Sequence, residues 1–426
     1  MKSVRIVFFV FMLILLWVPL LQSTFLVVKS KSLKGAIVPH SKPKFNFKSW
    51  FSGEYQSDFE HYLNDTIGFH ADLIRLRNQI DFSLYRKCHS FDVEVGKNGY
   101  LIATTHLDAH LGKNYSSTAK IDSNIVMLSQ LNDTLKKLNK TLLLMFAPSR
   151  GAFYLDIAPF WYSTKKIHES DYEHYLKRLA NTSINILDYN SWFLQMKSTA
   201  KHPLFTKCGI HWSTYGATLA GDSLVKLIEK LRGIDLPDLA IQSIELSDSA
   251  RNNDADLTEA LNLIWPLEND TMAYPTLNYN KEGKTKIKSL FIGDSFFFNI
   301  GHTKIPEDAF EEYSFWYYNS SIFSNGQNNG KNIRDIKLVD EILKHDVIAI
   351  ISTEVTLGDF GWGFIPNAWN VFFNPQDEKI AFFINEIKSQ PAWYEEIVQK
   401  ARKNNISVEA QLYDDAVYMA AQENIK

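Results

Sequence analysis

One short stretch, residues 288–296, limits what this 426-residue chain can fold into more than any other part of it. Residues 289–293 (SLFIG) have an apolar centre and are too few for an ordinary helix, so they predict a short buried parallel strand. Gly293 then allows a sharp turn that places Ser295 at the carboxyl end of that strand, where open α/β sheets carry their functional groups. The stretch therefore predicts an α/β fold in which Ser295 is a candidate nucleophile and the backbone N–H groups after it face a developing oxyanion.

Short apolar runs alternate with amphipathic segments along much of the chain. This alternation predicts a doubly wound parallel sheet that is covered by helices on both faces. A hairpin at residues 91–102 and two helices broken near Gly68 precede the sheet, and residues 234–286 show no regular pattern. Strands are expected at residues 142–146, 184–187, 311–318 and 346–352, and helices at residues 121–138, 171–180, 189–197, 214–231 and 335–345.

A serine hydroxyl is a weak nucleophile unless a base, usually histidine, can take its proton. The chain contains 12 His, and His211 stands in the most distinctive setting, within residues 207–216 (KCGIHWSTYG). This segment is a loop that leads directly into the helix expected at residues 214–231, so the imidazole can be held rigidly at the start of that helix. His211 is therefore the candidate base for Ser295.

The two segments together resemble the SGNH-hydrolase-like domain of the alginate O-acetyltransferase J/X family. In that family a His-Trp segment precedes the Gly-Asp-Ser segment, which is a circularly permuted order relative to ordinary SGNH esterases. Residues 64–76, 96–102, 146–150 and 257–263 look like further segments of the family, and the resemblance extends over about residues 51–352. It implies an SGNH-hydrolase-like three-layer α/β sandwich with a parallel central sheet, and acyl transfer through a serine acyl-enzyme.

One position departs from the family pattern. The family usually carries Asp two residues before the His, where it orients the imidazole, and this chain has Gly209 there. Three interpretations remain open: a Ser–His dyad oriented by a backbone carbonyl, a carboxylate supplied from elsewhere in the chain, or a site that has lost activity. Glu354 and Asp294 are candidates for the third member because both follow predicted strands, although Glu354 can also be an ordinary loop carboxylate and Asp294 can instead brace the turn.

Three more residues are candidates for contact with the substrate. Ser149 and Arg150 follow the strand at residues 142–146 and so lie at the same edge of the sheet as Ser295. Arg150 can hold an anionic or carbohydrate substrate, or it can be a plain surface charge. Trp212, next to His211, completes the set.

A second Gly-Asp-Ser-Leu string, residues 221–224, spells the familiar esterase motif more literally than the Ser295 segment does. It falls in the middle of the helix expected at residues 214–231, with no strand before it and no turn after it. We therefore interpret it as helix surface and not as a site.

The composition excludes some classes of function. A formal net charge of -3 and a pI near 6.5 give no support for a nucleic-acid partner. No Cys/His cluster has the spacing of metal ligands, so neither a metal nor another cofactor is expected. Cys88 and Cys208 are compatible with one disulfide or with two free thiols.

The first 28 residues predict a membrane anchor. Residues 4–28 are almost wholly apolar and long enough to cross a bilayer, and Lys2 and Arg5 favour a cytoplasmic N-terminus. No small-x-small cleavage site and no lipid-accepting cysteine follow, so an uncleaved signal anchor is expected. The predicted division is an anchor at 1–28, a linker at 29–44, the SGNH-like catalytic domain at 45–376 and a C-terminal helical cap at 377–426.

The resemblance and the anchor together favour an O-acyltransferase. It would transfer acetyl groups to a hydroxyl of a secreted or cell-surface polysaccharide, with a membrane-bound O-acyltransferase as the source of the acyl donor. The resemblance further implies a single-pass protein of the inner membrane whose main domain lies in the periplasm. Two alternatives remain: a carbohydrate esterase or deacetylase with the same site, and an inactive polysaccharide-binding or assembly component, which Gly209 makes credible.

Overall fold

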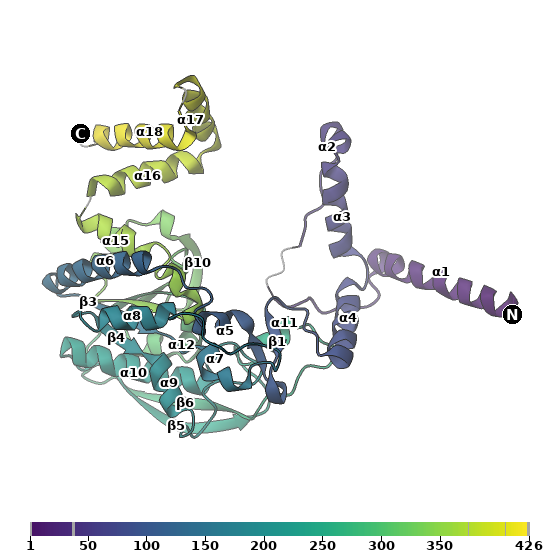
Figure 1. The fold of residues 1–426 in the computed structure, drawn as a ribbon, viewed down its shortest axis with the longest axis horizontal. Helices are drawn as coiled ribbons and strands as arrows, with labels where there is room; N and C mark the ends of the chain where they lie inside the picture. Colours follow the sequence, from purple (N-terminus) through teal and green to yellow (C-terminus); the bar gives the residue numbers. More distant parts are fainter. Residues whose placement is uncertain (1, 36–38, 374, 405, 424–426) are drawn as a thin grey trace.

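A seven-stranded sheet forms the centre of the computed structural model, which describes residues 2–35, 39–373, 375–404 and 406–423 (Figure 1). Its strand order is β10-β9-β8-β7-β11-β3-β4. The strands from β8 to β4 are parallel to their neighbours, and β9 and β10 add an antiparallel edge. The strands are β3 (Thr141–Phe146), β4 (Asn185–Asp188), β7 (Lys288–Gly293), β8 (Glu312–Tyr317), β9 (Ser321–Ser324), β10 (Gln327–Asn332) and β11 (Val347–Ser352).

The central strands are apolar on both faces because both faces are covered. All six residues of β11 are buried, and β7 and β3 flank it in parallel register. Side chains of a strand alternate between its two faces, so Leu143 and Met145 enter one core whereas Leu142 and Leu144 enter the other. This explains why these strands appear in the sequence as continuous apolar runs.

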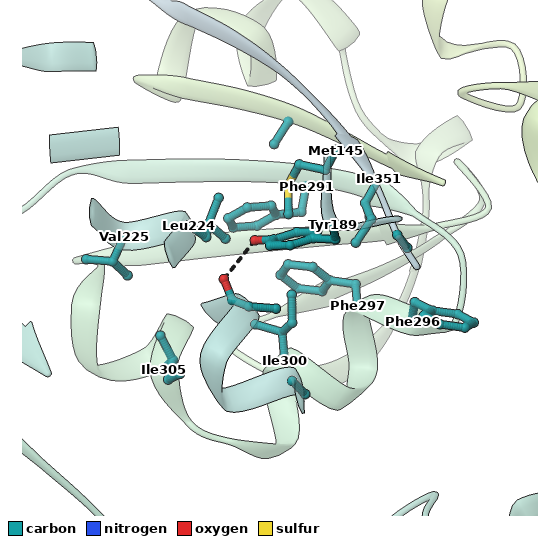
Figure 2. Close-up of a cluster of buried hydrophobic side chains, with 14 of the residues drawn as sticks. Met145, Tyr189, Leu224, Val225, Phe291, Phe296, Phe297, Ile300, Ile305 and Ile351 are labelled. Carbon is teal, nitrogen blue, oxygen red and sulfur yellow. Dashed lines mark hydrogen bonds between the residues drawn. The ribbon is translucent and has the colours of Figure 1, made fainter. Parts of the chain in front are cut away.

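Two layers of helices complete the sandwich that the sequence predicts. One layer packs on the core that contains Phe291, and Figure 2 shows part of that core, where the Tyr189 hydroxyl donates to the main-chain oxygen of Ala220 at 2.7 Å. This layer comprises α7 (Arg150–Phe153), α9 (Tyr189–Met196), α10 (Thr214–Arg232), α12 (Phe296–His302) and α13 (Ile305–Ala309). The opposite layer comprises α6 (Thr118–Lys137), α8 (Asp171–Leu179), α14 (Leu338–Lys344) and α15 (Phe364–Phe373).

The second Gly-Asp-Ser-Leu string lies inside α10, as predicted. Leu224 is buried in the core, and Asp222 pairs with Lys226 one turn later on the helix surface. Ser213 caps the start of α10 by accepting a hydrogen bond from Gly216 N at 3.0 Å. The string is thus an ordinary part of the helix, as predicted, but it is not all surface: Gly221 and Leu224 are buried, and Asp222 and Ser223 are half-buried.

One ladder that the sequence pattern does not indicate lies outside the central sheet, and the antiparallel edge strands β9 and β10 were not expected either. β5 (Asp238–Ser247) and β6 (Met272–Asn280) pair antiparallel, and the excursion between them carries α11 (Asp256–Ala260). Most residues of β5 are exposed, so the strand has no apolar alternation to detect. Only a few of the apolar side chains, such as Leu239 and Leu277, pack against the core beside α10.

The N-terminal helices project from the side of the sandwich, and the last three helices stand beyond α15 (Figure 1). The first group is α1 (Lys2–Phe25), α2 (Phe47–Ser52), α3 (Glu54–Thr66) and α4 (His70–Tyr85), and the last is α16 (Pro375–Ser389), α17 (Pro391–Asn404) and α18 (Val408–Glu423). The predicted hairpin is β1 (Val93–Val95) and β2 (Leu101–Ala103), joined by η1 (Lys97–Gly99). Short connecting elements are α5 (Thr104–His110), η2 (Leu155–Ile157), η3 (Ile333–Asp335) and η4 (Glu354–Asp359).

Candidate active site

Ser295 lies in the turn between β7 and α12, at the carboxyl edge of the sheet. Glycine is required at the end of β7 by packing, because a Cβ on Gly293 would lie 2.1 Å from Ile351 Cγ2 on the neighbouring strand. β7 can therefore pack closely against β11 up to its last residue. The chain then turns into α12, and the Ser295 hydroxyl stands at its start.

Asp294 braces this turn. Its Oδ1 accepts a hydrogen bond from Phe296 N at 3.1 Å, and its Oδ2 accepts hydrogen bonds from the main-chain N–H and the hydroxyl of Thr353 and from the hydroxyl of Thr356, all within 3.0 Å. The carboxylate is buried and joins the end of β7 to the end of β11. The hypothesis that Asp294 is the third catalytic member is therefore wrong in its geometry, because these donors direct the carboxylate away from His211.

His211 connects Ser295 to a carboxylate. Its Nε2 lies 2.8 Å from Ser295 Oγ, and its Nδ1 lies 2.6 Å from Asp256 Oδ2. The imidazole is 8% exposed, and its centroid lies 4.8 Å from that of the Phe296 ring. The loop on which it stands is fixed to α12 by two hydrogen bonds, since the Trp212 indole N–H donates to Phe296 O and the Asn299 amide donates to Trp212 O.

Asp256 is the residue that the sequence reasoning missed. It begins α11 and also accepts a hydrogen bond from Ile210 N at 2.8 Å through its other oxygen. The geometry supports the interpretation in which a carboxylate from elsewhere in the chain orients the imidazole. The sequence offered one signal for this residue. Asp256 directly precedes residues 257–263, a segment that resembles the family but to which the sequence alone assigned no chemical role.

The structure also explains why position 209 carries no aspartate. A Cβ on Gly209 would lie 2.6 Å from Thr206 Oγ1 and 3.0 Å from the main-chain oxygen of Asp254. Thr206 Oγ1 itself donates to that same oxygen at 2.7 Å. A side chain at position 209 would have to displace this hydrogen bond.

Glu354 lies in a different buried cluster. Its Oε1 lies 3.3 Å from His110 Nδ1 and 3.4 Å from the Ser170 hydroxyl, and the side chain is almost fully buried. The hypothesis that Glu354 is the third member is wrong for that reason, since its bonded oxygen faces α5 and α8 instead of His211.

The three candidate substrate-binding residues are inaccessible. Ser149, Arg150 and Trp212 are each 0% exposed. Ser149 Oγ caps α7 by accepting from Ala152 N, and the Arg150 guanidinium donates to the main-chain oxygens of Leu101, Thr206 and Lys207. These side chains support the loop that carries His211 and offer no polar atom to a ligand, so the prediction of substrate contact is wrong and Arg150 is not a surface charge.

The backbone N–H groups after Ser295 are used within the turn. Phe296 N donates to the Asp294 side chain, and Phe297 N and Phe298 N donate to the main-chain oxygens of Asp294 and Ser295. They do not face an oxyanion in this geometry. Tyr318 is a donor that the sequence did not indicate: its backbone has φ 50°, its N–H donates to Gly293 O at 2.8 Å, and its phenol interacts with Ser295.

Burial controls the charge of several groups around the site. Partial desolvation and the neighbouring Tyr317 and Asp294 raise the pKa of Tyr318, which is 37% exposed, and its phenol is in any case protonated at neutral pH. Burial, with the charges of Arg150 and His211, lowers the pKa of His106 to about 3, so His106 stays neutral. Burial also raises the pKa of Asp254, which holds the start of α10, to about 6. The thiols of Cys88 and Cys208 are both free in the described part of the chain.

Residues 93–295 match the family described as SGNH hydrolase-like domain, acetyltransferase AlgX. The matched part runs from β1 to Ser295 and includes His211 and Asp256. A comparison with curated proteins gives no match.

Similar solved structures include the O-acetyltransferase domain of Pseudomonas putida AlgJ, with 14% identity, a TM-score of 0.41 and coverage of 66% of this chain and 99% of that one. Pseudomonas aeruginosa AlgX has 12% identity, a TM-score of 0.40 and coverage of 65% and 67%. Bacillus cereus PatB1 has 12% identity, a TM-score of 0.38 and coverage of 58% and 94%. Residues 93–295, which carry all three members of the candidate site, therefore match the SGNH hydrolase-like acetyltransferase family of AlgX.

Proposed function

We propose that this protein is an SGNH-type O-acetyltransferase that forms an acetyl-enzyme on Ser295 and passes the acetyl group to a hydroxyl of a secreted or cell-surface polysaccharide. The observation that carries the proposal is the continuous chain from Asp256 through His211 to Ser295 inside the region that matches the acetyltransferase family. Asp256 supplies the acceptor that Gly209 lacks, which weakens the argument for an inactive binding component.

The geometry supports a two-step transfer. His211 Nε2 takes the proton of Ser295, whose Oγ bonds to the carbonyl carbon of the donor while the bond from that carbon to the donor's leaving group breaks. The imidazolium returns the proton to the leaving group. In the second step His211 takes the proton of the acceptor hydroxyl, the acceptor oxygen bonds to the acetyl carbon, and Ser295 leaves with its proton restored. Asp256 at Nδ1 stabilises the imidazolium in both steps.

The N-terminal helix supports a position at the membrane. Residues Ser3–Phe25 of α1 form an apolar helix with a mean hydropathy of 2.7, and its large apolar side chains are exposed and free to contact lipid, whereas Gln22 near its end is buried. We infer that α1 is an uncleaved signal anchor with its N-terminus in the cytoplasm and the sandwich in the periplasm. A polysaccharide under export is then the acceptor, and a membrane-bound O-acyltransferase supplies the donor.

The first test is covalent labelling. A sulfonyl fluoride probe added to the full chain is expected to label Ser295, and His211→Ala is expected to abolish the label. Ser223→Ala, which changes the serine of the Gly-Asp-Ser-Leu string in α10, is the matched control and is expected to label as the wild type does. Absence of a label on the wild type would contradict the catalytic proposal.

A second measurement separates transfer from hydrolysis. The full chain is supplied with a chromogenic acetyl ester, with and without an oligosaccharide acceptor, and the products are identified and quantified by mass spectrometry. When the acceptor is present, we expect acetylated oligosaccharide to form and the yield of free acetate to fall. Turnover that yields only acetate would identify an esterase.

A further inference from the structure

A continuous row of aromatic side chains runs along α2 and α3, and we call it the aromatic stripe. Neighbouring rings are in contact, with centroid distances of 5.7 Å for Phe45–Trp50, 5.8 Å for Tyr55–Phe59 and 6.1 Å for Phe59–Tyr62. The rings in contact are those of Phe45, Phe47, Trp50, Tyr55, Phe59 and Tyr62, and we include in the stripe Phe51, the exposed aromatic residue next to Trp50 on α2.

The described sandwich does not cover the stripe. Neither α2 nor α3 has a buried residue, and Phe47 and Phe51 are 72% and 84% exposed. Contiguous apolar surface of this kind marks a contact with another body. The stripe is therefore a surface whose partner lies outside the chain as described.

The spacing of the aromatic residues makes both helices amphipathic. In α3, Tyr55, Phe59 and Tyr62 recur at intervals of four and three residues and so share one face. Ser57 and Glu60 lie on the other side of that helix. The polar residues of α3 include Glu54, Asp58, Glu60 and Asp65 and no lysine or arginine, so an interfacial position of this helix depends on its aromatic face, with the acidic side chains in water.

The structure fixes α2 and α3, which together we call the arm, to the C-terminal end of α1. Gly68, in the corner between α3 and α4, donates its N–H to Ser23 Oγ at 2.6 Å, and a Cβ there would lie 2.2 Å from Pro19 O. In Figure 1, α1 points away from the sandwich and α3 lies crosswise to it at this junction. If α1 crosses a bilayer, α3 therefore lies roughly parallel to the bilayer plane, close to its surface.

The charge of the connecting segment favours a lipid surface as well. Between residues 26 and 48 the sequence has six lysines and no acidic residue. Lys44 and Lys48 flank the first aromatic residues of the stripe, and both are exposed. Basic side chains attract anionic headgroups, and aromatic rings concentrate at the level of the headgroups.

We propose that α2 and α3 lie in the headgroup region of the non-cytoplasmic leaflet, with the aromatic stripe turned toward the acyl chains. The partner of this surface is thus the phospholipid bilayer. The inference rests on the proposed role of α1 as a membrane anchor. Its consequence is that the sandwich is held at a set height and orientation above the membrane, because the α3–α4 corner cannot swing freely on α1.

Photochemical crosslinking tests this placement in the full chain, reconstituted into nanodiscs of phosphatidylethanolamine and phosphatidylglycerol. p-Benzoylphenylalanine replaces Phe51 in the stripe, Ser57 on the opposite face of α3, or Leu15 inside α1, one position at a time. After irradiation, intact-protein mass is expected to show phospholipid adducts at positions 15 and 51, at least about tenfold more than at position 57. The two test positions in the arm are both exposed, so folding is not at risk.

The outcomes separate the inference from the proposals on which it depends. If position 15 forms lipid adducts but position 51 forms no more of them than position 57 does, the interfacial placement of α2 and α3 is overturned and the membrane anchor is not. Loss of adducts at position 15 would overturn the anchor as well, and Ser295 labelling on the same sample reports the catalytic proposal independently. In cell membranes, a crosslink from position 51 to another protein or to a second copy in place of lipid would also overturn the inference.

Discussion

The carboxylate of Asp256 holds two groups of one loop. One oxygen faces the His211 ring and the other accepts the N–H of Ile210, so the imidazole and the main chain that carries it are positioned by the same residue. In the family pattern the aspartate stands on this loop itself, whereas here it comes from α11, in the excursion between β5 and β6. The imidazole needs an acceptor at Nδ1 in either arrangement.

Asp256→Asn is expected to lower kcat for acetyl transfer by about 10²- to 10⁴-fold with a smaller effect on KM, because an amide does not stabilise the imidazolium. Steady-state kinetics with the chromogenic ester measure this loss. Glu259→Gln changes an exposed carboxylate of the same helix and is the matched control. Equal kinetics in the two variants would contradict the assigned role of Asp256.

A family aspartate at position 209 is not expected to restore the Asp256→Asn variant. The side chain of Gly209→Asp would have to displace the hydrogen bond from Thr206 to Asp254 O, so the double variant should unfold at a lower temperature and remain as slow as Asp256→Asn. Recovery of activity in the double variant would show instead that the loop can rebuild the family arrangement.

At the scale of elements, the predictable parts are those whose pattern is local. The apolar runs of β3, β7 and β11 and the helical spacing of α10 appear directly in the sequence, and the structure has them within a residue or two. The β5–β6 ladder has no such signal because most of β5 is solvent-exposed and its main-chain bonds do not depend on side-chain type.

The third member of the site was hidden by the same ladder. Asp256 lies in the excursion between β5 and β6, and apart from its position before residues 257–263 the sequence does not distinguish it from nearby Asp254, which bonds to Thr214 instead of His211. Arg150 was misjudged for a related reason. Its charge suggests a surface, but carbonyl oxygens from two distant segments enclose it.

Arg150 joins the segment of Leu101 to that of Thr206 and Lys207, so its replacement should destabilise both segments. Arg150→Lys is expected to destabilise the fold by about 2–4 kcal/mol, because a single ammonium cannot serve the carbonyls of Leu101, Thr206 and Lys207 together. Urea unfolding measures the change. Arg251→Lys, at an exposed arginine paired with Glu245, is the control and should unfold as the wild type does; a similar loss in both variants would contradict this account.

At the scale of the whole molecule, the apolar interior is divided among separate clusters. The two large ones cover the faces of the seven-stranded sheet, and all three members of the candidate site stand at the rim of that sandwich. α16, α17 and α18 have clusters of their own, one around Phe383 and one around Ile387. None of the described residues of these helices belongs to either large cluster.

A chain that ends at residue 373 is therefore expected to keep its site. Because the C-terminal helices bury their apolar side chains chiefly against one another, their removal takes no residue from the two cores that position Ser295, His211 and Asp256. The rate of sulfonyl fluoride labelling at Ser295 should stay within about twofold of the full chain, with the cooperative unfolding of the sandwich retained. A matched chain that ends at residue 345 lacks β11, the central strand, and should fail to label. Loss of labelling in the longer truncation as well would show that the last three helices are part of the catalytic domain.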